Sequence, residues 1–228
     1  MRTAAILPVK RFAQAKQRLG ANVADNLRLQ LAGAMVADVL LALAQTDAIE
    51  CTIVVTREVL AARAAREQGA IVVEDLLESG QSAAVTLGVE LALAEGIERV
   101  LCIPGDCPAL DPAELESLLA GRAGAEREVV IVPDRHGTGT NGLLLTPPDA
   151  IAPSFGPDSC ERHRAHALDA GVEFRLERPP SLLLDIDTGA DLRVLRERLE
   201  GASSRAAGTR AVLGLRAHTD ALSETSAG

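Results

Sequence analysis

The chain has 228 residues, a length that fits one α/β domain. Hydrophobic residues make up 47% and charged residues 24%, so the chain can bury a sizeable core and is not expected to be disordered throughout. The formal net charge of -9 disfavours nucleic acid and anionic membranes as partners. Three Phe and no Tyr or Trp also leave few rings on which single-stranded bases could stack.

No apolar run is predicted to span a membrane, and the apolar part of the N-terminal segment is too short for a signal peptide. We therefore expect a cytoplasmic protein. The four cysteines include no CxxC pair and no Cys/His cluster with the spacing of a zinc site. Cys51 and Cys102 are expected to be small buried hydrophobic residues.

Short β-branched runs alternate with helical patterns along the chain. Strands are expected at residues 4–9, 51–55, 70–73, 99–103, 129–132, 143–145, 172–176 and 182–186. Helices are expected at residues 26–44, 58–68, 82–94, 112–119, 158–170 and 191–199. This alternation predicts an α/β fold with helices on both faces of a mostly parallel sheet.

The predicted domain covers residues 1–200. From residue 201 onward the chain is rich in Ala, Gly, Ser and Thr without a firm apolar period. Residues 201–228 are therefore predicted to be a disordered tail, in which only 211–215 could dock weakly.

Acidic residues follow two of the predicted strands, where ligands bind in parallel sheets. Asp106 lies in the turn PGDCP, where a carboxylate is a natural Mg2+ ligand, although it could also simply cap the turn. In LLLDIDT, alternation places Asp185 and Asp187 on one face of the predicted strand, and a divalent cation would relieve their repulsion. Thr188 and Asp191 have a structural explanation as the cap of the closing helix.

Three cations, Lys10, Lys16 and Arg18, follow the first strand in LPVKRFAQAKQRL. Cations in such a loop could neutralise a triphosphate and the charge that develops at the transferred phosphorus. A solvated basic segment leading into a helix is the alternative. The chain has no Walker-type Gly-Lys-Ser/Thr loop, which disfavours a P-loop NTPase.

Two further loops, GTGTN and FGPDS, carry polar groups close to predicted element ends. The first contains Thr140, and the second opens the helix at residue 158, where Asp158 and Glu161 have the spacing of a capping box. The amides near Gly156 and Ser159 would make an anion site at this helix N-terminus, although a purely structural helix start fits the pattern equally well.

The turn ESGQS, with Gly80, Gln81 and Ser82, precedes another helix. Its side-chain amide could contact a nucleobase edge, and a simple helix N-cap is the alternative. His163 and His166 lie on an otherwise charged helix and are expected at the solvated surface.

Taken together, LPVKRFAQAKQRL, PGDCPAL, GTGTN, FGPDS and LLLDIDTGADL resemble the guanylyltransferases that make the diphosphate-linked precursor of the deazaflavin coenzyme F-420. The match runs in order over about residues 1–200. PGDCP and DIDT turns also occur in the wider nucleotidyltransferase superfamily, such as the molybdenum-cofactor guanylyltransferases. The Pro-Val-Lys form after the first strand, in place of a Gly-rich loop, favours the deazaflavin branch.

The resemblance implies a Rossmann-like, three-layer α/β sandwich that transfers GMP from GTP to phosphoenolpyruvate or 2-phospho-L-lactate and releases diphosphate. It implies Mg2+ bound by Asp106, Asp185 and Asp187, and catalytic roles for Lys16 and Asp106. The implied acceptor residues are Thr140, Gly156 and Ser159. The implied nucleotide residues are Lys10, Lys16, Arg18, Gly80, Gln81 and Ser82.

Two alternatives stay open from the sequence. One is a nucleotidyltransferase for another acceptor, such as 3-phosphoglycerate or the molybdenum cofactor, and the other is a non-catalytic nucleotide-binding protein on the same fold. The presence of all three carboxylates favours an enzyme. The expected partners are GTP and a phosphorylated three-carbon acid, without nucleic acid or membrane, and a homodimer stays open.

Overall fold

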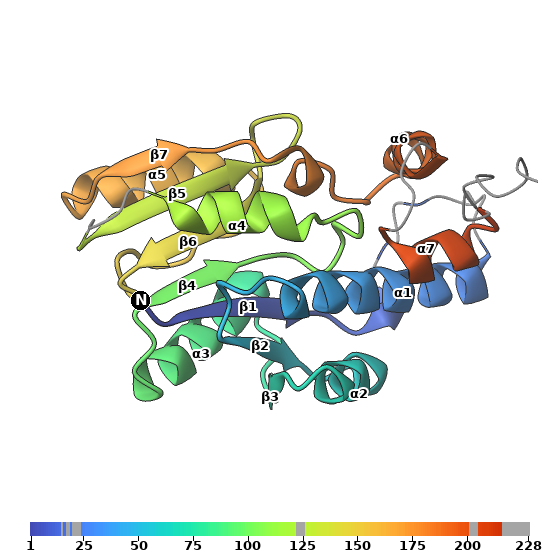
Figure 1. The fold of residues 1–228 in the computed structure, drawn as a ribbon, viewed down its shortest axis with the longest axis horizontal. Helices are drawn as coiled ribbons and strands as arrows, with labels where there is room; N and C mark the ends of the chain where they lie inside the picture. Colours follow the sequence, from blue (N-terminus) through green and yellow to red (C-terminus); the bar gives the residue numbers. More distant parts are fainter. Residues whose placement is uncertain (15, 17–18, 20–23, 122–125, 201–204, 216–228) are drawn as a thin grey trace, which may run out of the picture.

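The computed structural model describes residues 1–14, 16, 19, 24–121, 126–200 and 205–215 (Figure 1). The strands are β1 (Thr3–Val9), β2 (Cys51–Thr56), β3 (Ile71–Val73), β4 (Arg99–Cys102), β5 (Glu128–Pro133), β6 (Thr140–Thr146) and β7 (Phe174–Leu176). The helices are α1 (Asp25–Ala44), α2 (Val59–Glu67), α3 (Gln81–Ala94), α4 (Pro112–Ala120), α5 (Ser159–Asp169), α6 (Gly189–Glu200) and α7 (Ala207–Val212). Short 3-10 helices lie at Phe12–Gln14 and Pro180–Leu182.

One sheet contains all seven of these strands in the order β3-β2-β1-β4-β6-β5-β7. Neighbouring strands run parallel except at β6, which is antiparallel to both β4 and β5. The loop between β5 and β6 is too short for the helical crossover that a parallel connection needs, so β6 returns alongside β5. The predicted mostly parallel α/β sheet is confirmed.

Helices cover both faces of the sheet, as the apolar strands predicted (Figure 1). On β1, Ala5, Leu7 and Val9 pack in a core shared with α1, α2 and α4. The alternate residues Ala4 and Ile6 pack in a second core with α3 and α5. Because successive side chains of a strand point to opposite faces, β1 is buried on both sides, which gives three layers.

Helix α1 is long and apolar enough that its length and composition alone would allow it to cross a membrane, contrary to the prediction from the sequence. Half of its most apolar stretch is buried against the rest of the protein. Its buried residues, including Leu31, Met35 and Val39, contribute to two of the hydrophobic cores. A core helix of a layered α/β fold therefore accounts for this composition.

The predicted strand at residues 182–186 is wrong, because a 3-10 helix ends at Leu182 and the chain is irregular from there to α6. Leu182, Leu184 and Ile186 are buried, so the alternation of buried residues was predicted correctly. Leu182 packs with α1 and α4, whereas Leu184 and Ile186 pack with α6 and α7. The alternation therefore arises because these side chains pack between helices, and not because the segment pairs with a neighbouring strand.

The predicted disorder of the tail is wrong for residues 205–215, which contain helix α7. This helix packs beside α1 (Figure 1), where the buried Asp38 carboxylate accepts hydrogen bonds from the backbone amides of Gly208 (2.9 Å) and Thr209 (2.7 Å). Composition alone missed this contact because Asp38 is far away in the sequence. Residues 201–204 and 216–228 of the predicted tail lie outside the described residues.

Candidate active site

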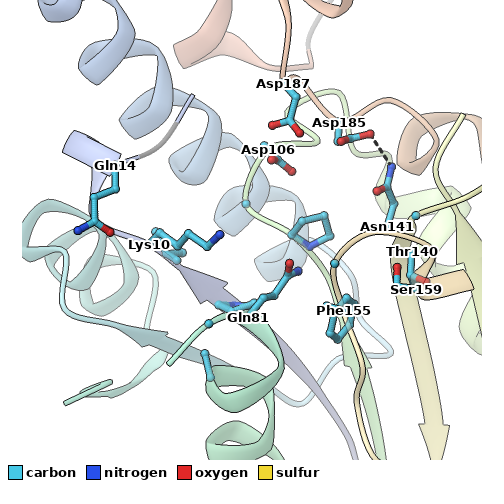
Figure 2. Close-up of a pocket in the computed structure, with 18 of the residues that line it drawn as sticks. Lys10, Gln14, Gln81, Asp106, Thr140, Asn141, Phe155, Ser159, Asp185 and Asp187 are labelled. Atoms are coloured by element: carbon cyan, nitrogen blue, oxygen red, sulfur yellow. Dashed lines mark hydrogen bonds between the residues drawn. The ribbon is translucent and has the colours of Figure 1, made fainter. Parts of the chain in front are cut away.

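A cleft of about 940 Å³ lies at the edge of the sheet where the parallel strands end. Because β6 runs antiparallel, its first residue, Thr140, reaches this same edge. Ten of the predicted site residues line the cleft (Figure 2): Lys10, Lys16, Gly80, Gln81, Asp106, Thr140, Gly156, Ser159, Asp185 and Asp187. Arg18 lies outside the described residues.

One side of the cleft, here called the acidic wall, consists of Lys16, Asp106, Asp185 and Asp187 (the carboxylates are labelled in Figure 2). A backbone hydrogen bond of 3.1 Å from the Ile186 amide to the Asp106 carbonyl joins the two acidic segments. The three carboxylates therefore come together, although the predicted strand geometry is absent.

Gly105 allows the turn that carries Asp106 to pass close to α1. A Cβ at this position would lie 3.0 Å from Cγ2 of Val36, closer than most carbon contacts. A residue with a Cβ would therefore require Val36 or the turn that carries Asp106 to shift by a few tenths of an ångström.

Lys16 bridges two of the carboxylates. Its ammonium forms a hydrogen-bonded ion pair with Asp106 and lies 2.9 Å from Oδ1 of Asp187, and its side chain is only 8% exposed. Burial alone would lower the pKa of Lys16, but the attraction of the two carboxylates outweighs it and raises the pKa above its ordinary value. Lys16 is therefore a fixed cation at neutral pH and is no candidate for a general base.

Asp185 has a different environment. Burial, followed by the charge of Asp106, raises the pKa of Asp185, and a hydrogen bond of 3.1 Å from Nδ2 of Asn141 acts in the opposite direction. Asn141 also donates to the Leu182 carbonyl at 3.0 Å, so it holds Asp185 against the segment that follows the 3-10 helix. The sequence did not single out Asn141 for this role.

The carboxylates of the acidic wall have the chemistry of a Mg2+ site. Oδ1 of Asp106 is buried and has no hydrogen-bond partner, and such an oxygen would be satisfied by a cation. Within the described residues, no three acidic, His or Cys side chains are spaced to hold one metal ion together. Lys16 supplies the positive charge between Asp106 and Asp187 in this structure. Mg2+ binding by these residues stays a prediction.

A second part of the cleft lining, here called the hydroxyl wall, consists of Thr140, Gly156 and Ser159. The side chains of Thr140 and Ser159 lie next to each other (Figure 2), and both residues are buried, with 7% and 1% exposure. Gly156 has a φ of +112°, a conformation that residues with a Cβ rarely adopt. The loop before α5 therefore requires glycine at this position.

The start of α5 differs from the predicted capping box. Asp158 adopts a left-handed conformation with a φ of 54°, and its side chain makes no capping hydrogen bond. Backbone carbonyls satisfy the first amides of α5 instead: Ser159 donates to Gly156 (3.1 Å) and Cys160 donates to Thr138 (3.1 Å). The Ser159 amide is therefore paired and not free as predicted, which leaves the Ser159 hydroxyl for a ligand.

His163 is buried with 0% exposure, so its predicted place at the solvated surface is wrong. Its Nε2 accepts a hydrogen bond of 2.9 Å from the Ser154 amide, and its Nδ1 lies 3.0 Å from Oγ1 of Thr140. The ring also packs edge-to-face on Phe155. Burial, and then the charges of His166 and Arg162, lower the pKa of His163 to about 4. No sequence pattern marks the burial of His163, because its contacts come from β6 and from the loop before α5.

The predicted nucleotide residues divide into two groups. Lys10 and Gln81 extend into the cleft (Figure 2), and Gly80 precedes Gln81 at the start of α3. Ser82 is not part of the cleft lining, and its hydroxyl accepts a hydrogen bond of 2.8 Å from the Phe155 amide. This contact ties α3 to the loop before α5, so the structure gives Ser82 a structural contact in place of the predicted nucleotide contact.

The sequence of this chain is similar to those of a known protein family. Residues 3–211 match the family described as guanylyl transferase CofC like. The chain is 50% identical over 213 residues to a phosphoenolpyruvate guanylyltransferase of Conexibacter woesei, covering 93% of this chain and 96% of that one. It is 38% identical over 212 residues to the protein of the same name from Sphaerobacter thermophilus, covering 92% and 100% of the two chains.

A solved structure shares the fold. It is a protein of Desulfovibrio desulfuricans provisionally assigned as a nucleotide-diphospho-sugar transferase, with a TM-score of 0.73, 18% identity, and coverage of 94% of this chain and 95% of that one. The family match and the sequence relatives show the family, and the solved structure shares its fold. The chain belongs to the CofC-like guanylyl transferases, a family of nucleotidyltransferase enzymes.

Proposed function

We propose that this protein transfers GMP from GTP to phosphoenolpyruvate, or to the closely related 2-phospho-L-lactate, and releases diphosphate. The identity of 50% to a relative named phosphoenolpyruvate guanylyltransferase supports the acceptor. The observation that carries the proposal is the shared cleft, which is lined both by three carboxylates with a fixed lysine and by a group of hydroxyls.

The proposed reaction is a single displacement. An oxygen of the acceptor phosphate attacks the α-phosphorus of GTP, the bond from that phosphorus to the oxygen shared with the β-phosphorus breaks, and diphosphate leaves with the bonding electrons. The acceptor phosphate is already anionic, so no general base is required. The protein has to align two anions and offset their repulsion.

Each wall has a part in this proposal. The hydroxyls of Thr140 and Ser159, with the backbone at Gly156, hold the acceptor. Lys10 and Lys16 contact the triphosphate, and Lys16 also keeps Asp106 and Asp187 in place.

The acidic wall would hold Mg2+ through Asp106, Asp185 and Asp187. When bound, the ion supplies positive charge at the transferred phosphoryl group, which a chain of net charge -9 otherwise lacks. Gly80 and Gln81 are assigned to the guanine base.

The family supports a place in the biosynthesis of coenzyme F-420, and the acidic composition supports a cytoplasmic enzyme without nucleic-acid or membrane partners. We expect GTP and the phosphorylated acid to be its only substrates, and size-exclusion chromatography would test the homodimer.

The proposal is tested by measuring diphosphate release from GTP and Mg2+ with phosphoenolpyruvate, 2-phospho-L-lactate, 3-phosphoglycerate or no acceptor. We expect release only when an acceptor is present, and the highest turnover with phosphoenolpyruvate. ATP and CTP replace GTP in parallel reactions and should give little product. Equal release without an acceptor, or with ATP, would contradict the proposal.

A further inference from the structure

The two hydrogen bonds of His163 determine which ring nitrogen carries the proton. A backbone amide can only donate, so the Ser154 N–H at 2.9 Å requires Nε2 of His163 to be an unprotonated acceptor. A neutral imidazole then carries its one proton on Nδ1. The ring is buried and its pKa is lowered to about 4, so the neutral form is the one present at neutral pH.

This tautomer decides what the Thr140 hydroxyl can do. Nδ1 of His163 lies 3.0 Å from Oγ1 of Thr140, so the ring donates and the hydroxyl oxygen accepts. The hydroxyl proton of Thr140 is then free for another acceptor, and the described residues provide none. Because Thr140 lines the cleft, this proton is available to a ligand there.

We propose that His163 is a positioning residue, which makes the Thr140 hydroxyl an obligatory hydrogen-bond donor to an anionic oxygen of the acceptor substrate. The identity of the acceptor rests on the proposed function, whereas the tautomer and the donor direction do not. A fully ionised phosphate or carboxylate oxygen accepts such a bond, and a group that presents a proton at the same place is rejected.

The surroundings of His163 keep the ring in this orientation. Arg162, the preceding residue of α5, donates from Nε to Oγ of Ser154 (2.9 Å) and from Nη2 to the carbonyls of Ser154 (3.0 Å) and Phe155 (3.1 Å). The ring of Phe155 packs on His163 with 5.1 Å between the centroids. The Ser154 amide therefore has a fixed position, and the ring has no second arrangement that would satisfy it.

The tautomer can be measured directly by 15N NMR of the histidine side chains in the full chain at pH 7. We expect His163 to show a protonated Nδ1 and an unprotonated Nε2, with its signals assigned by their loss in His163→Asn. A protonated Nε2, or an imidazolium, would overturn the proposal. This experiment needs no turnover, so its result stands even if the protein fails to transfer GMP to phosphoenolpyruvate.

Two substitutions separate the functions of the two ring nitrogens. In His163→Asn, the amide N–H lies near the position of Nδ1 and can still donate to Thr140. In His163→Gln, the carbonyl reaches the position of Nε2 and accepts from Ser154, but the donor to Thr140 is lost. We expect His163→Gln to raise the KM for phosphoenolpyruvate about 10-fold or more, with that for GTP changed by less than about twofold. We expect His163→Asn to raise the acceptor KM by less than about threefold.

A double-mutant cycle with Thr140→Val tests whether His163 acts through Thr140. Adding His163→Gln to Thr140→Val should leave the acceptor KM unchanged, because the group that His163 orients is already absent. His166→Asn, on the same helix, is the matched control and should match the wild type. Equal KM increases for the Asn and Gln variants, or full additivity in the double variant, would overturn the proposal. If His163→Gln fails to fold, the tautomer of His163 measured by NMR in the wild-type chain decides whether the proposal stands.

Discussion

The two walls of the cleft hold their polar groups in different ways. On the acidic wall, Asp106 and Asp187 share the ammonium of Lys16, and one buried oxygen of Asp106 has no partner. On the hydroxyl wall, Thr140 and Ser159 are buried, and they are hydrogen-bonded to the neutral ring of His163 and to the Gly156 carbonyl. The electrostatics of the acidic wall therefore depend on which cation is present, whereas the hydroxyl wall is already organised to accept an anion. Substitutions on the first should change turnover, and substitutions on the second should change the KM for the acceptor.

The largest effect is expected from Asp187→Asn. The substitution keeps the shape of the side chain and removes the charge that would help to bind Mg2+. Loss of metal-derived charge stabilisation should reduce kcat on the order of a thousandfold. The melting temperature should change little, because the side chain is 49% exposed. Glu161→Gln, an exposed carboxylate outside the cleft, is the control. A kcat within a few-fold of wild type would remove Asp187 from the proposed metal site.

Lys16→Met removes the cation of the acidic wall and so tests whether the stability of this wall depends on the cation that is present. Breaking a buried ion pair costs roughly 3–5 kcal/mol, and the partial exposure of Asp187 places the expected loss at the low end. Thermal melts with EDTA and with Mg2+ should show that Mg2+ stabilises this variant more than it stabilises the wild type. Equal Mg2+ effects on both proteins would show that Lys16 and the metal do not act on the same carboxylates.

The pH dependence of stability tests whether His163, which is hydrogen-bonded to Thr140 of the hydroxyl wall, is neutral in the folded protein. The pKa of His163 is about 4 in the folded chain and about 6.5 in the unfolded chain, since burial and the charges of His166 and Arg162 oppose protonation. Its contribution to stability is complete above pH 6.5 and is lost as the pH falls toward 4. The difference corresponds to about 3 kcal/mol at most.

Urea unfolding between pH 7 and pH 4 measures this contribution when wild type is compared with His163→Asn. The stability gap between the two proteins should narrow as the pH falls, because only the wild type has to keep this ring neutral. A gap that stays constant over this range would show that His163 titrates normally in the folded protein.

Ser159→Ala should have the smallest effect. Loss of one hydrogen bond to a charged group costs roughly 1.5–3 kcal/mol, which corresponds to an acceptor KM about 10- to 100-fold higher. The KM for GTP should stay close to that of the wild type. If the variant raises the KM for GTP and leaves the KM for the acceptor unchanged, the two substrates have been assigned to the wrong walls.

The acidic wall was predictable from the sequence because each of its carboxylates follows a buried apolar segment or alternates with buried residues. The alternation still places the carboxylates correctly, although residues 182–186 are not a strand. Because Leu184 and Ile186 are buried, Asp185 and Asp187 point away from the core and into the cleft. Lys16 was singled out for the triphosphate, but its bridging contacts depend on the tertiary fold.

The frame of the hydroxyl wall could not be predicted in the same way. His163, Ser154 and Thr140 meet only because β6 runs antiparallel and α5 packs behind it. Likewise, the docking of α7 depends on Asp38, a residue with no sequence feature that marks it as a helix cap. Contacts between distant polar residues leave no local pattern of hydrophobicity or spacing.

The most direct test of guanylyl transfer is to identify the products formed from GTP, Mg2+ and phosphoenolpyruvate by mass spectrometry and 31P NMR. We predict a new species in which GMP is joined to the acceptor through a diphosphate linkage, together with an equal amount of free diphosphate. The formation of GDP and inorganic phosphate, or recovery of unchanged GTP with every acceptor, would contradict the assignment of this cleft to nucleotidyl transfer.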